Sequence, residues 1–369
     1  MDRNSNMRSR FSILIVTDAW RPQVNGVART MQMLEDEFRA MGVRTVFLTA
    51  EGRRQLPMPG YPEIQLALAS PRSVGKTIEQ AQVDAVHIAT EGPLGLLARM
   101  HCRRVGRPFT TCFHTRYPEY IAARTMVPLT MSYAALRWFH GGAQATMVSS
   151  SALKIELASH GFGNLVVWRR GVDTALFASG APDALDLPRP IFLSVGRLAS
   201  DKNLDAFLRL DLPGSKVVVG DGPERLSLQA RYPKAHFLGL KSGHDLASLY
   251  ASADVFVFPS LTDTYGLVML EALAAGTPVA AFDVTGPREV LGDSGCGVMA
   301  ADLHAAAMLA LRIDRDKCRA YGAKQTVRSS AEHLLEIAKT TCGFDPSLIE
   351  QRSFSNQNNR DLLQKIGSA

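Results

Sequence analysis

Short apolar runs alternate with segments of helical spacing along most of the chain. The run "FSILIVTDAW" (11–20) predicts a buried strand that ends in polar residues, and "VARTMQMLEDEFRAMG" (27–42) has the period of an amphipathic helix that ends near Gly42. Further strands are predicted at 43–50, 83–90 and 108–115, with helix-like segments between them. Strands that alternate with helices indicate a parallel sheet covered by helices on both faces.

The same pattern begins again near residue 190. The segment 168–190 is rich in Pro, Gly, Ala and Asp, which predicts a linker, and it is followed by predicted strands at 191–197, 215–222, 235–240, 253–260 and 278–283. A chain of 369 residues is also too long for one compact core. We therefore expect an α/β protein with doubly wound domains over 1–172 and 173–343, and a polar, poorly ordered tail over 344–369.

Composition places the chain among soluble globular proteins, with 46% hydrophobic and 21% charged residues. The five cysteines have neither metal-ligand nor redox spacing, so we expect inert thiols in a reducing compartment. The apolar run near the start is too short for a signal peptide, and no apolar stretch is long enough to span a bilayer. These features predict a cytoplasmic protein and leave room for peripheral association with the inner face of a membrane.

The net charge of +6 is concentrated in the first half of the chain. Residues 1–175 contain 21 Lys and Arg against 13 Asp and Glu, and the remainder contains 20 against 22. A basic first half is compatible with an anionic membrane surface, a nucleic acid or an anionic substrate, and also with an unspecific drift of surface charge.

Ligands of doubly wound sheets bind beyond the carboxyl ends of the strands, and two polar segments there can contact phosphate. In "TDAWRPQVNGVART" the glycine Gly26 precedes a helix, where backbone N–H groups can approach a phosphate. In "SVGRLASDKN" the cations Arg197 and Lys202 can reach one diphosphate. Taken alone, the first segment also fits an ordinary helix start, and the second also fits two surface cations.

Two further strand ends can contact the nucleoside and the sugar. The turn "GDGP", with Asp221 and Gly222, can approach a flat base closely, and it also fits a plain turn. In "DTYGLVMLEALAAGTPV" the carboxylate of Glu271 lies in an apolar helix, where it can accept hydrogen bonds from ribose hydroxyls. Asp263, before that helix, can contact hydroxyls or serve as a helix cap. Together the four segments predict one nucleotide-diphosphate site.

The whole set of segments resembles the retaining glycosyltransferases of sequence family four. The resemblance covers about residues 11 to 340 and includes "FHTRYPEY" and "RRGVDTALF" between the segments above. It implies the GT-B fold, in which two Rossmann-like domains face each other across a cleft that holds the active site. The family motif has two glutamates separated by seven residues, and here Asp263 replaces the first, one methylene shorter.

The resemblance also implies residue roles. Arg197 and Lys202 would bind the diphosphate, Gly26 would approach it from the other domain, and Glu271 would hold the ribose. The sugar and phosphate would contact Asp263 and the backbone of Tyr265, Gly266, Leu267 and Val268, His114 would lie beside the transferred sugar, and the base would lie near Asp221, Gly222 and the segment from Leu240 to Leu246. Residues expected to contact the acceptor are Asp18, Asn25, Arg116, Tyr117 and Tyr120.

Family members transfer with retention at the anomeric carbon, and the leaving diphosphate itself can take the acceptor's proton. The resemblance therefore implies a reaction with neither a metal nor another cofactor. The Asp-x-Asp sequence at 314–316 follows no core strand, so we interpret it as solvated surface.

The segment 114–142 predicts the acceptor. It combines aromatic and methionine residues with three arginines, which is typical of an interfacial groove and also of an amphipathic core helix. "FHTRYPEYI" and "WRRGVD" are similar to the diacylglycerol glycosyltransferases, including sulfoquinovosyl-, glucosyl- and glucuronosyl-diacylglycerol synthases. We therefore expect transfer of a hexose or uronic acid from a UDP-sugar to diacylglycerol at an anionic membrane surface, without a nucleic-acid partner.

Other functions remain compatible with parts of the pattern. A GDP-mannose-dependent mannosyltransferase acting on a lipid or glycan would share the same segments, as would an inactive sugar-nucleotide-binding protein. A nicotinamide-dependent oxidoreductase would need a glycine-rich turn after the strand at 11–20, and it is absent. The Gly75-Lys76-Thr77 match to a phosphate loop lacks the first glycine and is interpreted as chance.

Overall fold

The computed structural model describes residues 11–21, 26–58, 61–114, 118, 127–263 and 265–343. Its contacts divide the chain into two compact units. The first comprises Met1–Phe113, Thr125–Met147 and Leu334–Ala369, and the second comprises His114–Arg124 and Val148–His333. Because the chain passes between the units more than once, they differ from the continuous intervals 1–172 and 173–343. The tail over 344–369 lies outside the described residues.

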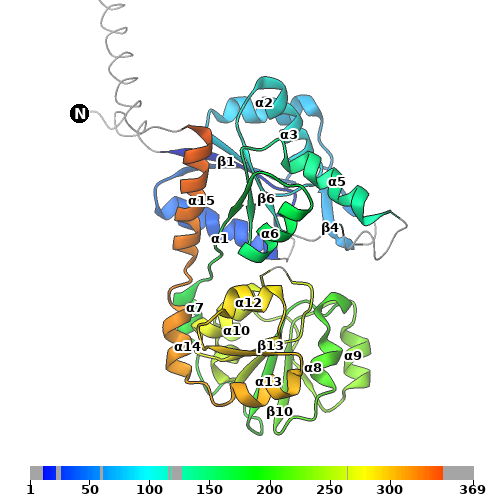
Figure 1. Cartoon of the computed structure of the whole chain (residues 1–369), viewed down its shortest axis with the longest axis vertical. Coiled ribbons are helices and arrows are strands. Elements are labelled where there is room, and N and C mark those ends of the chain that lie inside the picture. Colours follow the sequence, from blue (N-terminus) through cyan, green and yellow to red (C-terminus); the bar gives the residue numbers. More distant parts are fainter. Residues whose placement is uncertain are drawn as a thin grey trace, which may run out of the picture. The chain divides into compact units, whose positions relative to one another are not determined.

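Strands and helices form two doubly wound parts, as the alternating pattern predicts (Figure 1), and each of the two sheets has six strands. The first has the order β2-β1-β5-β6-β7-β8, and β1 pairs in parallel with both β2 and β5. Its strands are β1 (Ser12–Val16), β2 (Arg44–Leu48), β5 (Ala85–Ile88), β6 (Thr110–Phe113), β7 (Ala145–Val148) and β8 (Leu165–Val167). The associated helices are α1 (Gly26–Ala40), α2 (Pro71–Ala81), α3 (Pro93–Val105), α5 (Leu129–His140), α6 (Ser151–Ser159) and α15 (Val327–Cys342).

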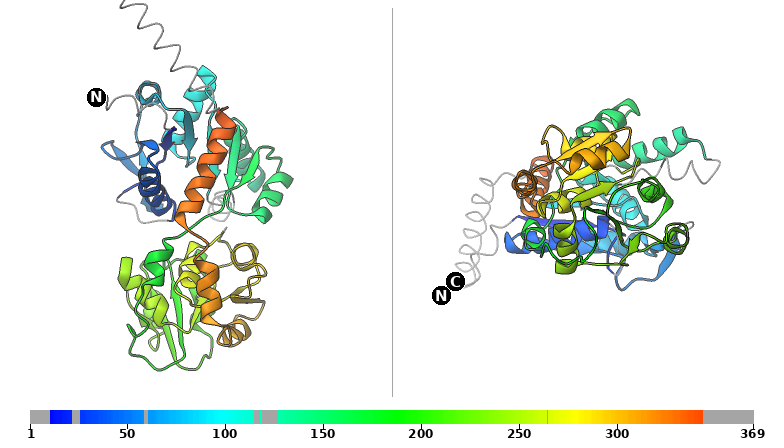
Figure 2. Two further views of the ribbon diagram at one scale, coloured as in Figure 1. Left: turned by 90° about the vertical axis from the view of Figure 1, so that its left-hand side faces the viewer. Right: turned by 90° about the horizontal axis from the view of Figure 1, so that it is seen from below.

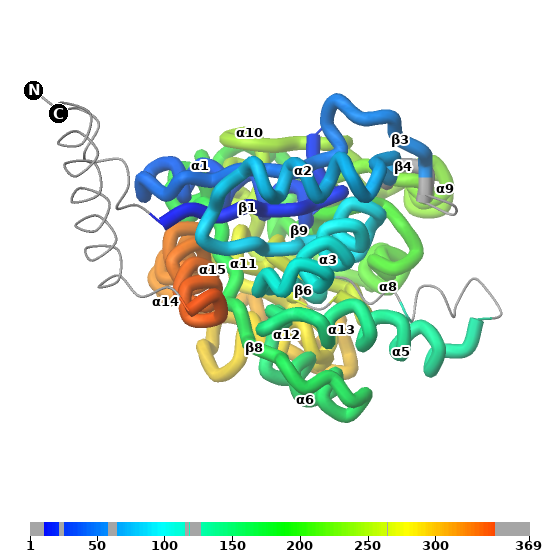
Figure 3. The backbone as a smooth tube through the Cα atoms, turned by 90° about the horizontal axis from the view of Figure 1, so that it is seen from above, coloured from blue at the N-terminus to red at the C-terminus, as the bar shows by residue number. Residues whose placement is uncertain are grey.

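Side chains of β1 are buried on both faces of the sheet, which requires helices on both sides. Leu14 and Val16 pack in a core with Val74 and Ile78 of α2 and Leu94 of α3. Figure 3 shows α2 and α3 side by side over this sheet. The last helix, drawn in orange in Figure 2, also belongs to the first unit from Leu334 on. There the Lys339 ammonium lies 5.3 Å from the ring centroid of Phe11.

The second sheet has the order β11-β10-β9-β12-β13-β14, and its pairings are parallel throughout. Its strands are β9 (Ile191–Val195), β10 (Ser215–Val219), β11 (His236–Phe237), β12 (Val255–Phe258), β13 (Val279–Phe282) and β14 (Gly297–Ala300). The helices around it are α7 (Thr174–Ala178), η2 (Ser200–Lys202), α8 (Leu204–Leu208), α9 (Arg225–Arg231), α10 (Gly243–Ser252), α11 (Leu267–Ala274), α12 (Thr285–Leu291), α13 (Leu303–Ala310) and α14 (Arg315–Gly322).

Alternation along β9 places its side chains in two cores. Ile191 and Leu193 pack with Tyr250 and Leu270, which belong to helices on one face. Phe192 packs with Phe207 and other residues of the helices on the opposite face. This double burial explains why the strand is an almost continuous apolar run, as in other parallel sheets.

The structure differs from the expected elements at several places. The segment 168–190 is not a free linker, because Val172 forms a bridge with Thr326 and Phe177 of α7 is buried in the second unit's core. Strands β7, β8 and β14 were not predicted, nor was a small antiparallel pair, β3 (Gln55–Met58) and β4 (Tyr61–Ala67). The phosphate-loop match at Gly75 lies inside α2, which confirms that it arose by chance. Among the described residues, no helix combines the length and apolar character needed to cross a bilayer.

Candidate active site

Five of the predicted site residues follow strands of the second sheet at the same edge. Arg197 and Lys202 come after β9, Asp221 and Gly222 after β10, and Asp263 after β12. Because the strands are parallel, their carboxyl ends lie along one edge of the sheet. The candidate active site of this unit lies along that edge.

The cations and carboxylates at this edge form a chain of alternating charge. Arg197 Nη2 lies 2.8 Å from Asp201 Oδ1, and Lys202 Nζ lies 3.5 Å from Asp201 Oδ2 and 2.5 Å from Asp263 Oδ1. The side chain of Asp201 is 9% exposed, whereas those of Arg197 and Lys202 are 35% and 26% exposed. Asp201 therefore anchors two cations from the protein side while both remain accessible to a ligand.

The turn that carries Lys202 is tied to the loop after β12. Asn203 adopts the left-handed conformation with φ of 53° and donates through Nδ2 to the Pro259 carbonyl at 3.0 Å. Ser260 Oγ donates to the Asp201 carbonyl at 3.3 Å. These bonds fix η2 against the loop that ends at Asp263, so the ion-paired cations are held from both strands.

The glycines of the "GDGP" turn are required by backbone packing. A Cβ on Gly220 would lie 1.9 Å from the Gly196 carbonyl oxygen, and one on Gly222 would lie 2.4 Å from that of Leu198. The Leu198 N–H in turn donates to the Asp221 carbonyl at 2.9 Å. The two strand ends thus approach too closely for side chains, which accounts for these glycines without a ligand. Their predicted contact with a base stays a prediction.

Glu271 is the buried carboxylate of α11. It is 2% exposed, and its Oε2 accepts a 2.9 Å hydrogen bond from the hydroxyl of Tyr250, which is also buried. The helix begins after Gly266, whose φ of 90° and contact with the Phe258 ring leave no room for a side chain. Glycine is therefore needed here to turn the chain from the Asp263 loop into the helix.

The remaining predicted donor residues differ in exposure. Tyr265, Leu267 and Val268 are half-buried against the core of the second unit. Burial raises the pKa of the Tyr265 hydroxyl to about 12, so this phenol stays protonated at neutral pH. Leu240 lies beyond β11 and is 62% exposed.

In the first unit, Asp18 has a clear structural role. Its side chain is 4% exposed, and its Oδ1 accepts from the Leu94 N–H at 3.2 Å, in the first turn of α3. Thr90 Oγ1 donates to its other oxygen at 3.3 Å. Burial raises the pKa of Asp18, although these hydrogen bonds oppose the shift. The predicted contact with an acceptor stays untested, and the cap alone explains this carboxylate.

Gly26 is the first residue of α1, and no atom of the residues that the structure describes lies within 4 Å of a Cβ built on it. These residues therefore leave room for a side chain there. This contrasts with Gly266, which the local backbone requires.

His114 follows β6 and is half-buried. Its Nδ1 lies 2.9 Å from Nη2 of Arg170, a buried guanidinium that stacks 4.0 Å from the ring centroid of Trp168. Because a guanidinium only donates, Nδ1 is the acceptor and the imidazole is neutral with its proton on Nε2. The predicted acceptor residues Asn25, Arg116, Tyr117 and Tyr120 lie outside the described residues.

The Asp-x-Asp sequence at 314–316 lies on the surface, as expected. Asp314 is the N-cap of α14 and accepts from the Asp316 N–H at 2.8 Å. Within the described ranges, no three His, Cys, Asp or Glu side chains are grouped as a metal site requires.

Three residues of the site were missed in the sequence. Asp201, Tyr250 and Arg170 each contact a predicted site residue directly. Asp201 offered a signal, because an acid next to Lys202 in a strand-end turn can pair with both cations. Tyr250 offered none, since it is 21 residues from Glu271 and sits in an apolar helix.

Two protein-family models match this chain. Residues 24–176 match the model of Glycosyltransferase Family 4, and residues 181–316 match that of Glycosyl transferases group 1. Together the two models cover both doubly wound parts of the chain.

Three curated relatives match most of the chain. A GDP-mannose-dependent alpha-mannosyltransferase of Mycobacterium tuberculosis is 32% identical over 78% of this chain and 83% of its own length. Sulfoquinovosyl transferase SQD2 of Arabidopsis thaliana is 28% identical over 79% of this chain and 63% of its own length. The alpha-monoglucosyldiacylglycerol synthase of Streptococcus pneumoniae is 25% identical over 72% of this chain and 70% of its own length.

Solved structures agree on the fold. A glycosyltransferase from Rickettsia africae superposes with a TM-score of 0.65 at 16% identity, covering 90% of this chain and 98% of its own. HepE of Anabaena, solved with UDP and glucose, gives 0.61 at 16% identity over 95% and 100%. These neighbours confirm the predicted GT-B fold. The family models and the 32% identical relative show that the chain belongs to glycosyltransferase family 4.

Proposed function

We propose that the chain moves a hexose or uronic acid from a UDP-sugar to diacylglycerol, with retention at the anomeric carbon. The observation that carries the donor half of the proposal is the ion-paired chain Arg197–Asp201–Lys202–Asp263 at the carboxyl edge of the second sheet. Two partly exposed cations held by a buried acid are suited to a diphosphate, which carries charge on several oxygens.

The donor would bind along this edge. The fork of Arg197 and the ammonium of Lys202 would contact the diphosphate, and Glu271 would accept hydrogen bonds from the ribose hydroxyls. Tyr250 donates to one oxygen of Glu271, and a carboxylate, with about four lone-pair sites, can accept more than one hydrogen bond. The solved complexes of HepE with UDP support a nucleotide donor of this type.

The chemistry would consist mainly of positioning and charge stabilisation. As the bond between the anomeric carbon and the diphosphate of the donor breaks, negative charge develops on the leaving diphosphate, and Arg197 and Lys202 would stabilise it. The same diphosphate would accept the proton of the acceptor hydroxyl on the same face of the sugar, so retention would need neither a covalent enzyme intermediate nor a metal.

His114 would act as a donor of a hydrogen bond to the transferred sugar. Arg170 fixes the neutral tautomer that carries the proton on Nε2, so the imidazole can donate to a hydroxyl or a carboxylate. Arg170 is therefore a positioning residue for His114.

The acceptor is proposed from the exposed surface of the first unit and from the relatives. On α5, Leu129, Met131 and Trp138 are 39%, 62% and 57% exposed, and Arg137 of the same helix is exposed as well. Apolar and aromatic side chains beside an exposed arginine are suited to the interface of an anionic membrane. The pneumococcal relative is named for synthesis of a glucosyldiacylglycerol, which supports a lipid acceptor.

A GDP-mannose donor is the second candidate. It is favoured by the 32% identical mycobacterial relative, whose name specifies that donor. The residues proposed for the diphosphate and the ribose would serve either nucleotide, because neither group differs between UDP and GDP.

The test is release of nucleoside diphosphate from UDP-glucose, UDP-glucuronate, UDP-galactose and GDP-mannose, each with and without diacylglycerol in mixed micelles. Release that requires one UDP-sugar together with diacylglycerol is the expected result. Release from GDP-mannose alone among the donors would move the assignment to the second candidate. If no donor is cleaved, diacylglycerol is rejected as the acceptor, and donor affinity measured by calorimetry would then establish which nucleotide-sugar binds.

A further inference from the structure

A pocket of about 380 Å³ lies on the second unit at the amino edge of its sheet. Arg189 precedes β9, Asp254 precedes β12, and Ala275 lies in the turn that leads to β13. The pocket is also lined by Arg315 and Arg319 of α14 and by small residues. The residues of the candidate active site follow these strands, so the pocket is separated from that site by the length of a strand, about 17 Å.

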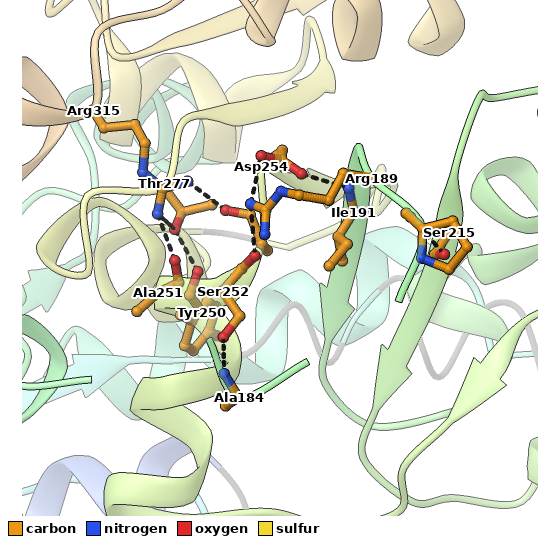
Figure 4. Close-up of polar contacts among 12 residues, drawn as sticks. Ala184, Arg189, Ile191, Ser215, Tyr250, Ala251, Ser252, Asp254, Thr277 and Arg315 are labelled. Carbon is orange, nitrogen blue, oxygen red and sulfur yellow. Dashed lines mark hydrogen bonds and ion pairs between the residues drawn. The ribbon is translucent and has the colours of Figure 1, made fainter. Parts of the chain in front are cut away.

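Two of its arginines are held in place by the end of α10 (Figure 4). Arg189 Nη2 donates to the Ser252 carbonyl at 3.1 Å and to Asp254 Oδ1 at 2.7 Å. Arg315 Nη2 donates to the Ala251 carbonyl at 2.7 Å, and its Nη1 donates to the Ala253 carbonyl. The guanidinium groups are therefore pre-positioned by backbone atoms, while Arg189 Nε and Nη1 donate to no group among the described residues.

The third arginine is attached only at the surface. Arg319 Nη1 contacts Asp316 Oδ1, and that carboxylate is 87% exposed. Its Nη2 lies 2.8 Å from the position of a Cβ on Gly276, so glycine at the end of α11 makes room for the guanidinium. Arg319 is thus aligned along the pocket wall with donors left for a ligand.

Positive charge predominates in this pocket. Three arginines line it, and two carboxylates offset part of their charge. Asp254 accepts from Arg189 and from the Ile191 N–H, and the exposed Asp316 pairs with Arg319. Burial lowers the pKa of Arg315, and the charges of Arg319 and Arg189 lower it further while Asp254 raises it. The mutual repulsion among three neighbouring cations is a cost that a bound anion would remove.

We propose that this pocket binds the phosphate group of a small soluble metabolite, away from the donor site. Guanidinium forks match the oxygens of phosphate in pairs, and three arginines line this pocket. The volume falls within the range of small-molecule sites, and the lining residues Ala178, Gly180 and Ala251 leave space for the body of a ligand larger than phosphate itself. The inference stands independently of which sugar the enzyme transfers.

The test measures binding of inorganic phosphate and glucose 6-phosphate to the full chain by calorimetry, with glucose as the neutral control and chloride used to match ionic strength. Both phosphates should bind and glucose should not. Arg319→Gln should weaken binding of both about tenfold or more, since it removes one charged donor at the surface. Arg328→Gln is the matched control, because Arg328 also pairs with an acid one turn away on a C-terminal helix, and should leave binding unchanged.

A phosphate could instead occupy the proposed donor site, so Arg197→Ala is measured alongside. Retained phosphate binding in Arg197→Ala together with its loss in Arg319→Gln would establish the second site. Equal affinity in Arg319→Gln and the unmodified chain, or loss in Arg197→Ala alone, would overturn it. Arg319→Lys keeps the charge without the fork and is expected to give an intermediate affinity, which keeps the test decisive if Arg319→Gln does not fold.

Discussion

The hydroxyl of Tyr250 donates a 2.9 Å hydrogen bond to Oε2 of Glu271, and both side chains are buried in the second unit. A buried carboxylate is costly unless its lone pairs are occupied, and this bond restrains one of the two oxygens. Tyr250 therefore decides the orientation of the carboxylate that we propose for the ribose.

Tyr250→Phe removes that hydrogen bond and little else. A hydrogen bond to a charged group is worth about 1.5–3 kcal/mol, so we expect a lower free energy of unfolding and a donor KM raised about tenfold. The matched control is Tyr321→Phe, whose hydroxyl donates to the Val290 carbonyl at 2.8 Å away from Glu271. That variant should lose some stability and keep the donor KM. An unchanged donor KM in Tyr250→Phe would remove Tyr250 from the site.

How much of this site could be predicted from sequence depends on the range of each interaction. The positions of Arg197, Lys202 and Asp263 followed from strand ends, because parallel strands bring their carboxyl ends to one edge. The bond between Tyr250 and Glu271 could not be predicted, since it depends on how α10 packs against α11.

Glycines and linkers were harder to interpret, because their roles depend on neighbours far along the chain. From the sequence, Gly220 fits a ligand-binding turn as well as a plain turn. Only the close approach of the Gly196 carbonyl explains why glycine is needed at this position. The segment 168–190 has the composition of a linker, but Trp168, Val172 and Phe177 within it are buried. The average composition of a segment does not show that single residues within it are buried.

Arg197→Ala tests the role of the diphosphate cations. Loss of one charge that stabilises the leaving group should lower kcat about 10²- to 10³-fold, and the melting temperature should change little because the side chain is 35% exposed. Arg328→Ala is the control, since Arg328 also pairs with an acid four residues away at 2.8 Å. Normal turnover in Arg197→Ala would contradict the diphosphate role.

Asp263 can be tested by changing its length and its charge separately. Asp263→Asn keeps the shape but removes the charge of the nearer of the two carboxylates that pair with Lys202, so we expect kcat to fall about tenfold or more as the ammonium is held less firmly. Asp263→Glu restores the residue of the family motif and should keep most of the activity. The exposed Asp36, which pairs with Arg39 at 3.2 Å, offers Asp36→Asn as a neutral control. Full activity in Asp263→Asn would show that the ion pair is dispensable.

The cysteines predict a pattern of chemical labelling. Cys102, Cys112, Cys296 and Cys318 are buried, whereas Cys342 is half-exposed. We expect a thiol reagent to modify about one thiol rapidly in the native chain at pH 8 and all five in denaturant. Rapid labelling of two or more thiols before unfolding would contradict the described burial.

The same thiols make stability depend on alkaline pH. Burial raises the pKa of Cys102 to about 11 and, together with Cys296, that of Cys318 to about 12, from an ordinary value near 9. Above pH 9 the unfolded chain loses these protons while the folded chain keeps them, so the free energy of unfolding should fall as pH rises from 9 to 11. Urea unfolding at pH 8 and pH 10 measures this, and replacing both thiols by alanine should reduce the difference.

The proposed membrane surface can be tested at Met131, which is 62% exposed on α5. Burial of a methionine side chain contributes about 1.5–3 kcal/mol, so Met131→Ser should weaken binding to vesicles that contain anionic lipid about tenfold. Leu226→Ser is the control, because Leu226 is 81% exposed on α9 of the second unit and should leave vesicle binding unchanged. Binding of the unmodified chain should also weaken as salt rises, since salt would screen the attraction between the exposed Arg137 of α5 and the anionic lipid. Equal losses in both variants would place the membrane contact elsewhere, and no vesicle binding at any salt concentration would reject the membrane proposal.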